Sequence, residues 1–176
     1  NYASAIVNLG NHLATTESQV SSMGQRIAAA GAQTKMSQAE ILGWAGAMSS
    51  LGVEAEAGGT AFSTTISTIN AAVAKGGKDL ETFAKIAGMS SKEFASSWRT
   101  SASDTMVSLL KGVDGAENMT IALENMGVTG IRQSDVLKRL AGNTDLVTKA
   151  IGYSNEGWRE NTALQNEVDN RNSSMA

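Results

Sequence analysis

The sequence predicts an all-α protein, an array of short helices joined by glycine turns and flanked by longer polar helices. Three observations favour helix. The 176 residues contain no proline, the residue that most strongly interrupts helices. Apolar residues recur at helical spacing, most clearly in the series Phe62, Ile66, Ile69 and Val73. The 18 glycines fall mostly between such apolar segments, as expected of helix ends.

Apolar periodicity places the expected helices along the chain. The stripe from Phe62 to Val73 predicts a helix over residues 60–75. Two shorter stripes, one beginning at Leu80 and one at Met119, predict short helices that end at Gly88 and Gly127. Further helices are expected over residues 37–51, 91–100, 104–111, 131–141 and 145–151.

Helix starts carry their own signals. Ser37 with Glu40, and Ser90 with Glu93, fit the capping box, in which each side chain satisfies a backbone N–H group of the first turn. Each such cap contributes about 1 kcal/mol. We therefore expect helices to begin directly after Ser37 and Ser90.

Helix stops share one pattern, a helix end followed by glycine and then an apolar residue. It occurs at Gly52, Gly88 and Gly127, which are followed by valine, methionine and valine. The pattern predicts a left-handed glycine and an apolar contact back onto the helix. Gly142 is placed with these structural turns. The pair Gly58-Gly59 is expected to form a turn leading into a helix, since no lysine follows it as in a phosphate-binding loop.

Three parts are expected along the chain. Residues 1–36 form a polar helical flank, residues 37–157 a helical core, and residues 158–176 a polar helical arm leading into a longer chain. Apolar residues are sparse in the first and last parts, which predicts exposed helices or coiled-coil-like arms. The chain begins without methionine and stops without a helix stop signal, so we expect a window cut from a longer protein.

Composition excludes several classes of function. Without cysteine there is no disulfide framework, no thiolate nucleophile and no cysteine-based zinc site. The net charge is -3 and no basic run exceeds two residues, which argues against sequence-specific nucleic-acid binding. No apolar run approaches the roughly 18 residues of a membrane span, and the start does not resemble a signal peptide.

Candidate chemistry is sparse, and no catalytic, cofactor or metal site is expected. His12 is the single histidine, expected on the solvated surface. Carboxylates occur in the pairs Glu54 and Glu56, Asp79 and Glu81, and Asp114 and Glu117. We expect them at helix starts, where the helix dipole favours negative charge. An acid pair for glycoside cleavage is the alternative, testable by peptidoglycan release with Glu-to-Gln controls.

The three tryptophans are expected to differ. Trp44 and Trp98 are expected to be buried, and Phe94, which precedes Trp98 by four residues, makes one helix face aromatic. Trp158 lies among polar residues, so it is either a packed side chain or a contact with another chain.

An ordered series of segments covers residues 37–168. It includes SLGVEAEAGGTAF at 50–62, FAKIAGMSSKEFA at 83–95, Trp98, MGVTGIR at 126–132, LKRLAG at 137–142 and NTAL at 161–164. In order and spacing this series resembles the core region of bacteriophage tail tape measure proteins. Each segment alone is generic, whereas the ordered series over more than a hundred residues is difficult to mimic.

The resemblance implies a long, mainly helical virion protein inside the tail tube or at the tail tip, present in the host cytoplasm during assembly. Its residue count would set tube length, because a helix advances 1.5 Å per residue. The implied partners are the tail tube protein, tail-tip or baseplate hub proteins, tail assembly chaperones and further copies in a threefold or sixfold homo-oligomer. Family members leave the tail ahead of the genome, and some carry membrane-active or cell-wall-degrading segments elsewhere.

A folded core of short helices that end at glycines spans less distance per residue than one continuous helix, so it is poorly suited to measuring length. We therefore expect residues 37–168 to act as an anchor or plug that packs against the tail tip or its own copies. Two alternatives are a cell-wall-degrading helical module and a generic helical interaction or secretion-related protein. Only the ordered series argues against the latter.

Overall fold

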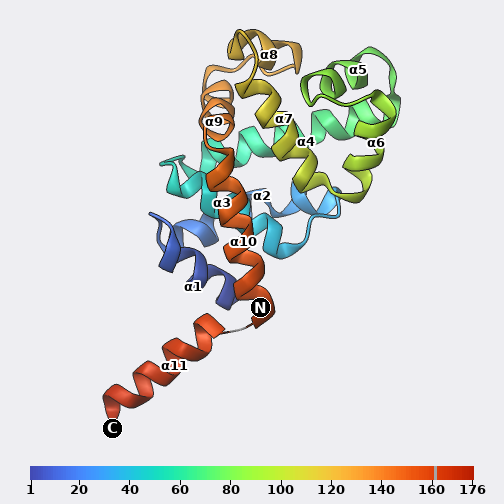
Figure 1. Ribbon diagram of the computed structural model, residues 1–176. Coiled ribbons are helices and arrows are strands. Elements are labelled where there is room, and N and C mark those ends of the chain that lie inside the picture. Colours follow the sequence, from blue (N-terminus) through green and yellow to red (C-terminus); the bar gives the residue numbers. More distant parts are fainter. Residues whose placement is uncertain (161) are drawn as a thin grey trace.

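The computed structural model describes residues 1–160 and 162–176, with the side chains of residues 162–164 left aside, and its regular elements are all α-helices (Figure 1). The prediction of an all-α fold is confirmed for this part of the chain. The side chains of the NTAL segment at 161–164 lie outside the described residues. The helices are α1 (Tyr2–His12), α2 (Glu17–Gln33), α3 (Gln38–Ser50), α4 (Ala55–Lys75), α5 (Gly77–Ile86), α6 (Ser91–Thr100), α7 (Ala102–Asp114), α8 (Met119–Asn125), α9 (Ile131–Ala141), α10 (Thr144–Glu160) and α11 (Thr162–Met175).

Helices α1 to α10 pack into one body, from which α11 extends (Figure 1). Helix α10 runs from the middle of this body to its lower end in the view of Figure 1. It contacts α7 and α9 near its start, α3 along its middle and α1 toward its end. The first and the penultimate helices of the chain therefore lie side by side, although they are far apart in the sequence.

The predicted helices agree with the structure in place, and several differ in extent. Helices α6 and α9 have the predicted bounds, and α3 differs by one residue at each end. Helices α7 and α10 are longer than predicted, with α10 continuing nine residues beyond Ile151 to Glu160. Periodicity missed this extension because the continuation is polar apart from Tyr153 and Trp158.

Gly58 and Gly59 lie inside α4, so the prediction of a turn at this pair is wrong. Both positions are buried where α4 crosses α2. A Cβ atom on Gly58 would lie 2.8 Å from Cε of Met23, and one on Gly59 would lie 2.8 Å from Cβ of Arg26. The absence of a side chain at these two positions leaves room for the side chains of Met23 and Arg26, which is a different use of glycine from a chain turn.

Three of the predicted glycine stops have left-handed backbone angles, with φ of 77° at Gly52, 73° at Gly88 and 89° at Gly127. At the first, the Val53 N–H donates to the Met48 carbonyl at 3.0 Å and the Gly52 N–H to the Ser49 carbonyl at 3.0 Å. The same pair of hydrogen bonds recurs after Gly88 and Gly127, the arrangement known as the Schellman motif. Gly142 also ends a helix, α9, but with a right-handed φ of −74°.

A fourth stop of this kind has no glycine. Lys35 takes the left-handed position with φ of 62°, and the Met36 N–H donates to the Gly31 carbonyl at 3.2 Å. Met36 is buried, as are Val53 and Val128, the apolar residues in the same place after two of the glycine stops. Sequence reasoning missed this stop because it searched for glycine.

The N-terminal flank is part of the core, so the prediction that residues 1–36 are exposed is wrong. Helix α1 buries Ala5 and Leu9 completely, and α2 buries Val20, Met23 and Ile27. These three residues of α2 follow one another at spacings of three and four, which places them on one face. Their stripe is narrow and the rest of the helix is polar, so the sequence pattern did not reveal that α2 is buried.

Trp44 and Trp98 are buried, as predicted. The Trp44 Nε1–H donates to Oγ of Ser103 at 2.9 Å, and its ring packs against Phe62 with centroids 5.6 Å apart. The rings of Trp98 and Phe94 are stacked with an interplanar angle of 4°. Large aromatic side chains thus fill the region between α3, α4, α6 and α7.

The predicted boundary between residues 157 and 158 falls inside α10. Beyond α10, the described side chains of α11 are largely exposed, with Met175 at 79%. In the part of the chain that the structure describes, no helix is long and apolar enough to cross a membrane.

Candidate functional site around helix α1

Helix α1 lies antiparallel to α10 and is held along its length by contacts with it. The Asn1 backbone nitrogen donates to the carbonyl of Trp158, and Asn8 Nδ2 donates to the carbonyl of Tyr153 at 2.7 Å. The His12 ring stacks on Tyr153, with centroids 4.3 Å apart. The start of α1 therefore meets the end of α10, and the two ends of the helical body lie together (Figure 1).

Gly157 permits the close approach of these helices. A Cβ atom there would lie 2.7 Å from the Ser4 carbonyl oxygen and 3.0 Å from Cα of Ala5, both of which are backbone atoms that cannot rotate away. A second glycine of α10, Gly152, has open space where its Cβ would be. Only one of these two glycines is therefore required by packing.

The opposite side of α10 is fixed to α3. Ser154 Oγ donates to the Ala39 carbonyl at 2.5 Å, and a Cβ atom on Gly43 would lie 2.6 Å from Cα of Ile151. Helix α10 is thus clamped between α1 and α3, with small residues and backbone acceptors at the closest points of contact.

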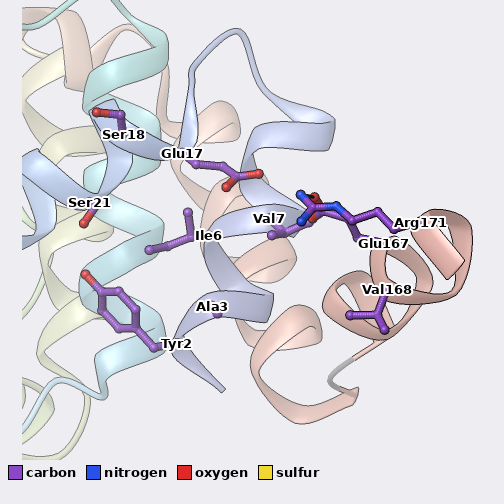
Figure 2. A pocket seen from close by; sticks show the side chains of 10 residues that line it. All are labelled: Tyr2, Ala3, Ile6, Val7, Glu17, Ser18, Ser21, Glu167, Val168 and Arg171. Atoms are coloured by element: carbon purple, nitrogen blue, oxygen red, sulfur yellow. Dashed lines mark hydrogen bonds and ion pairs between the residues drawn. The ribbon is translucent and has the colours of Figure 1, made fainter. Parts of the chain in front are cut away.

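A groove of about 470 Å³ lies between α1, the start of α2 and α11. Figure 2 shows Tyr2, Ile6 and Val7 of α1 along this groove, and Val168 of α11 among the residues on its other side. Ile6 and Val7 are each 8% exposed, whereas Val168 is 43% exposed. Apolar side chains of α1 and of α11 thus line this groove.

Charged residues border the groove. Arg171 and Glu167 form an ion pair within α11, one turn apart, and Glu17 points toward this pair from the first turn of α2 (Figure 2). An exposed ion pair at this spacing contributes about 0.3–0.5 kcal/mol, so it supports α11 only weakly.

The predicted helix caps lie elsewhere on the body. At α3 both capping-box hydrogen bonds are present, from the Glu40 N–H to Ser37 Oγ and from the Ser37 N–H to Glu40 Oε1. At α6 Ser90 accepts from the Glu93 N–H, and the cap has this half of the box. Sequence reasoning missed a complete box at α2, formed by Thr16 and Gln19, although glutamine also fits the capping-box pattern.

The predicted acidic pairs are placed differently from one another. Glu54, Glu56 and Asp79 lie at the first turns of α4 and α5, as predicted. Asp114 is the last residue of α7, so its expected place at a helix start is wrong. Glu117 precedes Asn118, and Asn118 is the residue that caps α8. No group of three or more metal-ligating side chains forms among the residues described.

His12 is exposed, as predicted, although it is stacked on Tyr153. Trp158 is partly buried and packs against the core of its own chain. His12 and the backbone of Trp158 both take part in the α1–α10 contact, at its opposite ends, while the predicted caps and turns are spread over the body.

Known proteins give no family assignment for this chain: no family model, curated protein or solved structure matches it.

Proposed function

We propose that this chain is a non-enzymatic segment of a phage tail tape measure protein and that its helical body acts as an anchor at the tail tip. The observation that carries the proposal is the ordered series of segments over residues 37–168, which resembles the core region of that family. The series runs from α3 into α11 and so spans most of the body.

Residues of that series make the contacts on which the body depends. Phe62 packs on Trp44, and Phe83 stacks on Phe94 with centroids 6.2 Å apart. Gly52 and Gly127 end α3 and α8. Residues of the series pack together within one body. This supports the view that the resemblance covers a single folded unit.

The path of the chain favours an anchor over a ruler. Asn1 and Trp158 are hydrogen-bonded partners, so the body adds little to the distance between its two ends. As one continuous helix, the same residues would span about 240 Å. A folded body with adjacent ends is suited to hold a position, and the measuring role belongs to extended helix elsewhere in the proposed longer protein.

Deletion of residues 37–168 from the tape measure gene of the phage tests the anchor role. We expect tails to be nearly absent in electron micrographs of infected cells, because initiation at the tip fails. Tails of normal number, shortened by about 200 Å, would overturn the anchor role and extend the ruler into this region.

A tandem duplication of residues 1–160 gives the matched test, since it preserves a complete body. We expect tails of unchanged length, because a second folded body adds little span. A ruler made of this segment would lengthen tails by about 240 Å.

A further inference from the structure

We infer that α1 is a clasp on α10, which opens first when tension acts between the two ends of the body. The inference rests on the proposed function in one respect, namely that an anchored segment of a longer chain carries tension between its two ends. The geometry of the clasp itself comes from the α1–α10 contact, and both tests below use the isolated chain.

The position of the ends decides how force would load the contact. Residue 1 and the end of α10 meet at the same end of the antiparallel helix pair. Tension between them separates the pair from that end, so contacts break one after another. The order is the Asn1–Trp158 hydrogen bond, the backbone contact at Gly157, the Asn8–Tyr153 hydrogen bond and the His12–Tyr153 stack.

The chemistry of the contact also favours early opening. On the α10 side it is made by a glycine, two backbone carbonyls and the ring of Tyr153. The large apolar contact of α1 is directed elsewhere, because Leu9 packs at Gly46 of α3. The polar and small-residue contacts with α10 therefore break first, and full opening of α1 then exposes the buried side chains of Ala5 and Leu9.

Opening is expected to stop at the start of α2. The Gln19 N–H donates to Thr16 Oγ1 at 3.2 Å and the Thr16 N–H donates to Gln19 Oε1 at 3.1 Å, which fixes the first turn of α2. The buried residues Val20, Met23 and Ile27 then hold α2 in the core. The clasp is therefore a unit that ends at Thr16.

Force spectroscopy tests the clasp directly, and the chain has no native cysteine that would compete with engineered attachment points. Handles at Asn1→Cys and Arg159→Cys load the clasp from its open end. We expect a first extension of about 50 Å, the length of the chain from residue 1 to residue 16, before the body yields. Release of the whole body in a single step would overturn the inference.

A second pair of handles, at Lys78→Cys and Asp145→Cys, serves as the control. Both positions are exposed, and α1 does not lie between them along the chain. We expect this pair to open at a higher force and without the first extension. Equal opening forces for the two pairs would also overturn the inference.

Hydrogen exchange tests the clasp without force. Gly157→Ala inserts a methyl group against the backbone of α1, and Gly152→Ala makes the same change in open space on the same helix. We expect amides of α1 to exchange about tenfold faster or more in Gly157→Ala, with α6 and α7 unchanged, and no such increase in Gly152→Ala. Asn8→Ala, which adds no bulk, should shift α1 in the same direction.

Uniform loss of protection over the whole body in Asn8→Ala would mean that α1 is not a separate unit, and would overturn the inference. Neither this result nor the force measurement depends on tail assembly. A failed clasp therefore leaves the proposed anchor role standing, and a failed anchor role leaves the clasp standing.

Discussion

The aromatic region between α3, α4, α6 and α7 and the contact between α1 and α10 are both buried, yet they are built from different side chains. In the first, Trp44, Phe62, Phe94 and Trp98 bury large rings. In the second, Gly157 and backbone carbonyls allow two helices to approach closely. The stability of the first region comes from the burial of apolar surface. The second region depends on the close approach of two helices, which one added methyl group would disturb.

Trp44→Ala should have the largest effect, because it removes a fully buried ring and leaves Ser103 without its hydrogen-bond partner. We expect the free energy of unfolding, measured by urea denaturation, to fall by about 3–5 kcal/mol. Trp158→Ala is the control within the chain, since that ring is only partly buried. Similar losses for the two variants would contradict the division into two kinds of region.

Gly58→Ala tests whether close approach matters within the body as it does at the clasp. The added methyl group would lie 2.9 Å from Cγ1 of Val53 and against Met23, so we expect a loss of about 1–3 kcal/mol. Gly152→Ala, with open space around it, should instead raise stability by about 0.5–1 kcal/mol through helix propensity. Thermal unfolding of both variants measures the difference, and a gain in Gly58→Ala would refute the close-packing argument.

The two predicted capping boxes provide a smaller test that is local to helix starts. Ser37→Ala should cost about 1 kcal/mol, because the hydroxyl caps α3. Glu40→Gln and Glu40→Ala separate charge from hydrogen bonding at the complete box. Glu93→Ala should cost less than Glu40→Ala, since Glu40 also accepts from the backbone of the capping residue. Chemical denaturation of the four variants decides the order.

Local rules predict local features of this chain well. The stop at Gly88 and the cap at Ser37 depend on residues within a few positions of each other, and such signals are present in the sequence itself. The burial of α2 escapes these rules because its stripe of Val20, Met23 and Ile27 is narrow. The prediction at Gly58 fails because a glycine required by a neighbouring helix resembles a glycine required by a turn.

The candidate site is the least predictable part. The Asn8–Tyr153 hydrogen bond joins residues 145 positions apart and uses a backbone acceptor, which carries no side-chain signature. Sequence reasoning places Gly157 at a domain boundary, although its role is to let α1 pack closely against α10. Long-range contacts between small residues are invisible to periodicity, because periodicity identifies a buried face but not its partner.

Lys35→Gly gives the smallest expected effect and compares the glycine-free stop with its glycine counterpart. Lys35 holds a left-handed backbone at φ of 62°, a conformation that costs a residue with a side chain about 1 kcal/mol, so glycine there should raise the free energy of unfolding by about 0.5–1 kcal/mol. Gly52→Ala should lower it by a similar amount, since no atom lies within 4 Å of the added Cβ and only backbone strain changes. If urea denaturation shows that Lys35→Gly raises the free energy of unfolding and Gly52→Ala lowers it, backbone conformation sets the stability of both turns. A loss in Lys35→Gly would instead mean that the lysine side chain stabilises the end of α2 by more than its backbone strain costs.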